Sequence, residues 1–94
     1  MGIKHNMKKR TIDYITRNTL IIISDNLISI DEEITLETEF KNISIDSITF
    51  VKIIIELEKF FNIEFDDDMI LLSEFKTVRS MVDYIFLKIN PKIK

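Results

Sequence analysis

The chain has 94 residues, a formal net charge of −3 and an apolar fraction of 46%. This length holds one domain with a single core, and the apolar content is too high for a disordered protein. The acidic balance argues against nucleic acid as the main partner, because phosphate binding needs a basic surface. No apolar run approaches the length that crosses a membrane. We therefore expect neither a nucleic-acid nor a membrane partner.

Cysteine is absent and histidine occurs once, at His5. A chain without thiols can form no disulfide and no thiolate metal site, which fits a cytoplasmic location in a reducing compartment. The acidic run Asp66-Asp67-Asp68 does not match a calcium-binding loop, because apolar residues follow where a glycine and further oxygen ligands are needed. We expect no metal site.

The interior of the chain is almost free of helix breakers, since the single glycine, Gly2, and the single proline, Pro91, lie near the termini. This favours helices joined by Asn/Asp/Ser loops over a hairpin-rich β fold. We predict an all-α small four-helix bundle, with three main helices and a short third helix. The whole chain, 1–94, forms one domain, with frayed tails at 1–7 and 90–94.

The first helix is predicted from about residue 8 to about residue 25, because its apolar positions recur on one side at helical spacing. These positions are Ile12, Ile15, Thr19, Ile22 and Ile23. The β-branched isoleucine triplet at 21–23 could form a strand instead, but the periodicity extends beyond it. A long loop follows to Asp46, and Ile34, Leu36 and Phe40 are expected to anchor it to the core.

The second helix is predicted over about 47–62, and a short helical segment over about 66–72. Thr77 is expected to cap the last helix. The apolar face of that helix consists of Val78, Met81, Val82, Ile85 and Ile89.

The second helix carries two apolar faces when successive residues are rotated by roughly 100°. The expected core face consists of Phe50, Ile53, Ile54, Leu57, Phe60 and Phe61. The opposite stripe consists of Ile48, Val51 and Ile55. Either the long loop covers this stripe or the stripe is exposed and binds partner proteins. We favour exposure, because the stripe begins next to Ser47.

Ser47 stands where the polar loop gives way to the second helix. It could simply be the helix cap, although Asp46 could serve equally well. A nucleophilic serine needs a general base and an oxyanion hole, and the chain has one histidine and no Gly-x-Ser-x-Gly elbow. We therefore expect no enzyme. An exposed hydroxyl without catalytic support suits an attachment point, where a phosphodiester would lie at the positive end of the helix dipole.

Several segments between residues 40 and 85 carry a family pattern. They are Phe40, Ile45-Asp46-Ser47-Ile48, Glu56-Leu57-Glu58, Phe61, Ile63-Glu64-Phe65, Asp67-Asp68, Phe75, Thr77-Val78 and Val82-Asp83-Tyr84-Ile85. In this combination the stretch resembles the acyl and peptidyl carrier proteins. Ser44 departs from the pattern, since the family usually has glycine two residues before the aspartate.

The resemblance implies that Ser47 receives 4′-phosphopantetheine from a phosphopantetheinyl transferase, with coenzyme A as donor. The arm would carry an acyl or aminoacyl group as a thioester. Implied partners are a loading enzyme, either an adenylating enzyme or an acyltransferase, and downstream synthase, condensation or tailoring enzymes. A monomer is the implied state.

Fatty-acid carriers are typically acidic along the second helix, and here Thr49, Lys52 and Lys59 interrupt that acidity. This favours a stand-alone carrier of a specialised pathway, of nonribosomal-peptide or polyketide type. A fatty-acid carrier and an unmodified scaffold protein with the carrier fold are the alternatives. The residues expected to contact partners are Asp46, Ile48, Val51, Lys52 and Ile55, with Met69 and Ile70 on the short segment.

Overall fold

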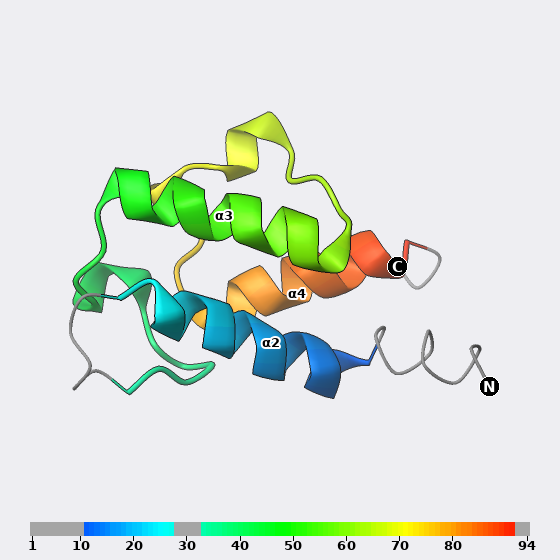
Figure 1. Cartoon of the computed structure of the whole chain (residues 1–94), viewed down its shortest axis with the longest axis horizontal. Coiled ribbons are helices and arrows are strands. Elements are labelled where there is room, and N and C mark those ends of the chain that lie inside the picture. Colours follow the sequence, from blue (N-terminus) through cyan, green and yellow to red (C-terminus); the bar gives the residue numbers. More distant parts are fainter. Residues whose placement is uncertain (1–10, 28–32, 92–94) are drawn as a thin grey trace.

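The computed structural model describes residues 11–27 and 33–91, and these ranges contain three α-helices. They are α2 (Ile12–Asp25), α3 (Ser47–Phe61) and α4 (Val78–Ile89). Within the same ranges there is no strand, only an isolated bridge between Glu39 and Thr77. Helix α2 packs against both α3 and α4 (Figure 1). The predicted all-α class is therefore confirmed.

Helix α2 begins later than the sequence pattern predicts. Thr11 has extended backbone angles and its side chain accepts a hydrogen bond from Tyr14 N at 3.2 Å, so it caps a helix that begins at Ile12. The rest of the predicted start, 8–10, lies outside the described residues. Ile12 was expected on the buried side but is 42% exposed, because it lies in the first turn at the end of the helix. The strand alternative for 21–23 is wrong.

Helix α3 is capped at both ends by polar residues. Asp46 caps its start, and Asn62 ends it in the left-handed conformation with φ 56°, which asparagine tolerates better than most residues. The core face was predicted correctly for Phe50, Ile53, Ile54 and Leu57. It was wrong for Phe60, which is 47% exposed and stacks on Tyr14 at 6.2 Å between ring centroids.

The long loop before α3 is fastened to the start of α4. Val78 N donates to Thr38 O at 3.0 Å and Arg79 N donates to Leu36 O at 2.9 Å. These bonds satisfy backbone donors that a helix start leaves without partners. The loop also contains a 3-10 turn, η1 (Phe40–Asn42), which the sequence pattern did not reveal. The predicted anchors do pack on the core, with Phe40 buried and Ile34 and Leu36 half-buried.

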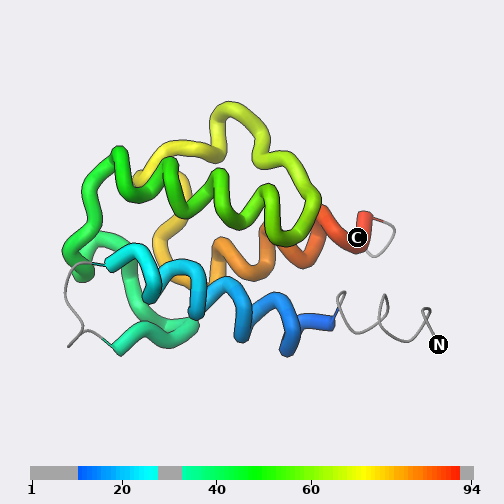
Figure 2. Tube along the Cα trace, in the orientation of Figure 1, coloured from blue at the N-terminus to red at the C-terminus, as the bar shows by residue number. Residues whose placement is uncertain are grey.

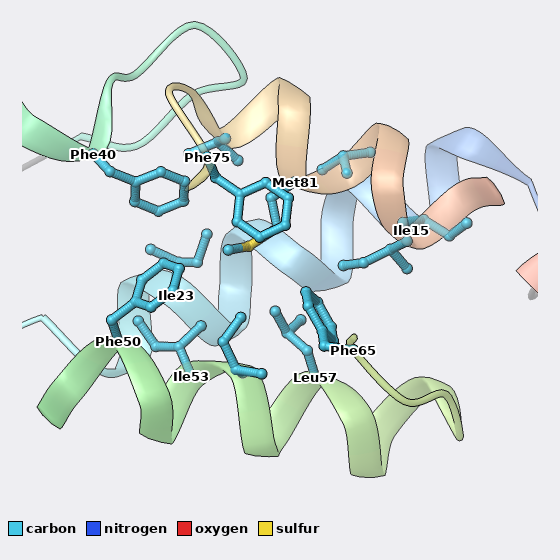
Figure 3. Close-up of a cluster of buried hydrophobic side chains, with 13 residues drawn as sticks. Ile15, Ile23, Phe40, Phe50, Ile53, Leu57, Phe65, Phe75 and Met81 are labelled. Carbon is cyan, nitrogen blue, oxygen red and sulfur yellow. The ribbon is translucent and has the colours of Figure 1, made fainter. Parts of the chain in front are cut away.

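The core lies between the three helices and is rich in aromatic rings. Figure 3 shows side chains of α3 projecting toward Phe75 and Met81. The rings of Phe40 and Phe50 meet edge to face, 5.7 Å apart, and those of Phe65 and Phe75 do so at 6.1 Å. Edge-to-face pairs at these distances stabilise a core beyond their buried area. The start of α3 is therefore fixed against the loop that carries Phe40.

The short helical segment predicted over 66–72 is present only as a 3-10 turn that begins after Asp66, and its predicted length is wrong. The chain makes two separate 3-10 turns instead, η2 (Asp67–Met69) and η3 (Leu72–Glu74). The backbone becomes extended at Leu71, with ψ 139°, which interrupts any longer helix. Figure 2 shows this stretch leaving the end of α3 and returning toward its start before α4 begins.

The C-terminal tail also begins later than expected. Asn90 was assigned to a frayed tail, but its backbone N–H and its side-chain amide both donate to Phe86 O, at 2.9 and 3.1 Å. It is therefore the C-cap of α4. Residues 1–7 and 92–94 of the predicted tails lie outside the described residues.

Candidate functional site

Ser47 is the first residue of α3, and its neighbour Asp46 is the cap. Asp46 Oδ1 accepts a hydrogen bond from Thr49 N at 2.8 Å. The interpretation of Ser47 as the cap is therefore wrong. The side chain of Ser47 is exposed, and no hydrogen bond engages its hydroxyl within the described part of the chain. The Ser47 oxygen is therefore exposed at the start of α3 and takes no part in capping the helix.

Asp46 is ionised at neutral pH and is not placed to act as a base. The hydrogen bond from the Thr49 backbone N–H lowers the pKa of the Asp46 carboxyl below its ordinary value. A carboxylate that is stabilised in this way is a weak proton acceptor, whereas a general base needs a pKa near the working pH. Asp46 therefore places a negative charge beside Ser47 and does not activate its hydroxyl.

An open cavity of about 730 Å³ adjoins Ser47. Its wall is mainly apolar, with one lysine from η1 and another just before α4. The lining residues are Phe40, Lys41, Ser47, Leu71, Leu72, Ser73, Phe75 and Lys76. The sequence interpretation missed Leu71 and Leu72, whose only signal was their place at the end of the apolar run Met69-Ile70-Leu71-Leu72 that follows the three aspartates.

The stripe that begins beside Ser47 is exposed. Ile48 is 81% exposed, Val51 38% and Ile55 44%, so the alternative in which the long loop covers them is wrong. Lys52, on the same helix, is also exposed. These residues and Asp46 therefore lie with Ser47 on one accessible helix, as the sequence predicted.

The two remaining predicted contact residues are placed differently. Met69 and Ile70 are half-buried and pack against the core, and neither lines the cavity beside Ser47. The next residue, Leu71, is 56% exposed and does line it. The extended backbone at Leu71 accounts for the shift, because it carries that side chain outward between the two 3-10 turns.

The fold and the site together define a class of protein: a small helical domain that offers an unbonded serine hydroxyl at a helix start, beside an open and largely apolar cavity. Comparison with known proteins identifies the family within this class. The family described as "Phosphopantetheine attachment site" matches residues 22–85. The chain belongs to this family, the phosphopantetheine-binding acyl carrier proteins, which are non-catalytic carriers with covalently attached 4′-phosphopantetheine.

Curated relatives agree with this assignment. The chain is 38% identical over 64 residues to the acyl carrier protein of Lactococcus lactis subsp. cremoris (strain MG1363), an alignment that covers 68% of this chain and 82% of the relative. It is 40% identical over 62 residues to the acyl carrier protein of Phytoplasma australiense, covering 64% of this chain and 79% of the relative. No solved structure gives a significant match.

The residues around Ser47 fit the prosthetic group. A phosphodiester on the serine oxygen would lie at the positive end of α3. Lys41 and Lys76 line the same cavity and carry the opposite charge, although Lys41 also pairs with Glu39 at 3.6 Å. The apolar wall from Phe40, Leu71 and Phe75 suits the aliphatic part of the arm.

Two further expectations concern metals and membranes. In the ranges that the structure describes, no cluster of His, Cys, Asp or Glu could hold a metal ion. None of the helices found there is long and apolar enough to span a membrane.

Proposed function

We propose that Ser47 is the residue that carries 4′-phosphopantetheine. The observation that carries the proposal is the combination of an exposed, unbonded hydroxyl with a separate cap residue, Asp46. Since Asp46 fills the cap position, an ester on Ser47 can form without loss of the bond that begins α3. The bound arm supplies the thiol on which an acyl or aminoacyl group is held as a thioester.

The modification would be made by a phosphopantetheinyl transferase. In this step the serine oxygen forms a bond to the phosphorus next to pantetheine, the pyrophosphate bond of coenzyme A breaks, and adenosine 3′,5′-bisphosphate leaves. The proton of the hydroxyl goes to a base of the transferase, because Asp46 is held in the cap. The part of this chain is to hold the oxygen outward at a fixed position.

Intact-mass measurement tests the assignment. The protein is incubated with a promiscuous phosphopantetheinyl transferase and coenzyme A, and we expect a gain of one phosphopantetheine. The matched control is Ser44→Ala, which removes a neighbouring exposed serine and leaves the gain unchanged. A gain that persists in Ser47→Ala, or no gain in the unaltered protein, would refute the proposal.

We further propose that the protein is a stand-alone carrier of a specialised pathway of nonribosomal-peptide or polyketide type. The support is the exposed side of α3, which carries Lys52 and Lys59 in place of acidic residues. Its partners would be an adenylating enzyme or an acyltransferase for loading, followed by synthase, condensation or tailoring enzymes. A monomer in the cytoplasm fits this role, since a reducing compartment keeps the thiol of the arm free.

A carrier of fatty-acid synthesis is the second candidate, and the relatives named acyl carrier protein favour it. The two roles are separated by loading the modified protein with malonyl groups through a fatty-acid malonyltransferase. We expect a kcat/KM at least about tenfold below that of the Lactococcus lactis carrier, which corresponds to about 1.4 kcal/mol in the transition state. Equal rates would favour the fatty-acid role.

An unmodified interaction protein is the remaining alternative, and the family match argues against it, because members of this family carry 4′-phosphopantetheine. It would bind a partner through the exposed stripe of Ile48, Val51 and Ile55 and show no mass gain. The same mass measurement therefore decides between this role and a carrier.

A further inference from the structure

The outward side of α3 is apolar and basic. At roughly 100° per residue, five positions fall opposite the buried residues of the helix. Three of them are apolar and two are lysines: Ile48, Val51, Lys52, Ile55 and Lys59. All five are exposed, and Ile48 most of all, at 81%. We call this surface the outer face of α3.

The two carboxylates of α3 lie at the edges of the outer face and are already bonded to other parts of the chain. Glu56 Oε1 accepts from Asn26 Nδ2 of the segment that follows α2, at 3.1 Å. Glu58 Oε2, on the other flank, accepts from Phe65 N at 2.8 Å. Each bond links α3 to a neighbouring segment and engages the carboxylate there.

The lysines of the outer face have no such partners. Within the described ranges, the salt bridges join Lys41 to Glu39, Arg79 to Glu37 and Lys88 to Asp66, and none involves Lys52 or Lys59. The apolar part, in turn, forms one continuous stripe that starts at the residue after Ser47. Exposed apolar stripes with a charged rim are typical of protein interaction sites.

We propose that the transferase that modifies Ser47 docks on the outer face through an apolar surface with carboxylates opposite Lys52 and Lys59. This inference rests on the proposed attachment at Ser47. A transferase must reach an oxygen that lies one residue before Ile48, so it covers the first turns of α3. The outer face continues from there along the same side of the helix to Lys59 in its last turn. Complementary charges steer such an encounter and suppress partners of the wrong sign. A partner with a basic surface would meet the two lysines of the outer face and, beside Ser47, one exposed carboxylate, that of Asp46, which accepts the cap hydrogen bond from Thr49 N.

The test compares two phosphopantetheinyl transferases chosen from their known structures. One has Asp and Glu around its carrier-binding surface and the other has Lys and Arg. We measure kcat/KM for modification of the unaltered protein and of the double variant Lys52→Glu/Lys59→Glu. With the acidic enzyme we expect the double variant to react about tenfold more slowly at low salt, and the difference to shrink at high ionic strength. With the basic enzyme we expect the order to reverse.

Matched controls separate docking from general charge and from folding. Arg17→Glu reverses one exposed charge on α2, outside the outer face, and is compared with Lys52→Glu alone. We expect Arg17→Glu to leave kcat/KM within about twofold, since the charge is outside the docked surface. Circular dichroism and thermal unfolding confirm that each variant is folded.

The outcomes are distinguishable. If neither transferase adds mass to the unaltered protein while both modify the Lactococcus lactis carrier, the attachment at Ser47 is refuted, and the docking proposal with it. If mass is added but the unaltered protein reacts faster with the basic enzyme, or the double variant keeps its rate with the acidic one, only the docking proposal is overturned.

Discussion

Asp46 caps α3 and Ser47 is exposed beside it, a difference that the sequence alone could not establish. Both residue types are good helix caps, so the pattern Asp-Ser left the cap open. The structure assigns the cap to Asp46, because its Oδ1 lies 2.8 Å from Thr49 N, and no hydrogen bond to the Ser47 hydroxyl occurs among residues 11–27 and 33–91. The sequence therefore predicted the place of Ser47 at the start of the helix, whereas the division between cap and free hydroxyl depends on the three-dimensional structure.

This division predicts opposite effects of two alanine substitutions. Ser47→Ala should change the free energy of unfolding by no more than about 0.5 kcal/mol, as expected for a surface residue without specific contacts. Asp46→Ala removes the cap and should lower the midpoint of thermal unfolding. Both are measured by circular dichroism on the unmodified protein. A larger loss for Ser47→Ala than for Asp46→Ala would contradict the assignment of the cap.

The hydroxyl oxygen of Thr19, Oγ1, is buried and has no hydrogen bond. Among the described residues it is the one buried side-chain oxygen or nitrogen in this state. It lies on the buried side of α2 with no exposed surface. A buried hydroxyl without a partner destabilises the folded state, because it loses its bonds to water. Thr19→Val keeps the shape and removes that cost, so it should raise the free energy of unfolding by about 1 kcal/mol. Urea unfolding measures the change, and a destabilised variant would imply a bond to the hydroxyl in solution.

The elements differ in how well the sequence predicted them. Helices α3 and α4 follow from apolar spacing and from the caps at Asp46 and Thr77. The two 3-10 turns between these helices, η2 and η3, do not follow from the local sequence, because they depend on contacts with residues that are distant in sequence. Asp66 does precede the 3-10 turn η2, as the pattern predicts, but its carboxylate is bonded to the Tyr84 hydroxyl at 2.8 Å and to Lys88 Nζ at 3.1 Å and does not cap the turn. A partner 18 positions away leaves no local signal.

The contact between Asp66 and α4 makes stability depend on pH. Hydrogen bonds from Tyr84 and then Lys88 lower the pKa of the Asp66 carboxyl below the ordinary value of about 3.9. A group with a lowered pKa in the folded state stabilises it above the unfolded pKa, and this contribution disappears as the pH falls through the folded pKa. The effect should therefore be complete at neutral pH and vanish in strong acid.

Asp66→Asn should accordingly be less stable than the unaltered protein at pH 7, and the difference should disappear as the pH falls through the lowered pKa of the folded state, below which the carboxyl is protonated in both states. Urea unfolding across this range gives the difference. Asp67→Asn is the matched control, because the Asp67 carboxylate has no hydrogen bond or ion pair in the described part of the chain. A difference that stays constant with pH would show that the Asp66 charge is not responsible.

At the scale of the whole molecule, the side of α3 that forms the core lies opposite the side proposed to bind partners. The buried side contacts the core that Figure 3 displays, while the outer face makes no part of it. Glu56 and Glu58 hold the helix at its two edges. The core can therefore fix the position of Ser47 while the surface beside it remains open, which is what a passive carrier requires.

This separation predicts that two substitutions on the same helix should have different effects. Val51 lies on the outer face, so Val51→Glu should change the free energy of unfolding by no more than about 0.5 kcal/mol. The same substitution should slow modification of Ser47, because it places a charge in the apolar stripe. Ile54→Ala removes a side chain that is 1% exposed and should cost about 2–5 kcal/mol. Where it remains folded, it should be modified at the normal rate. Urea unfolding and transferase kinetics on both variants test this, and a strongly destabilised Val51→Glu would mean that the stripe belongs to the core.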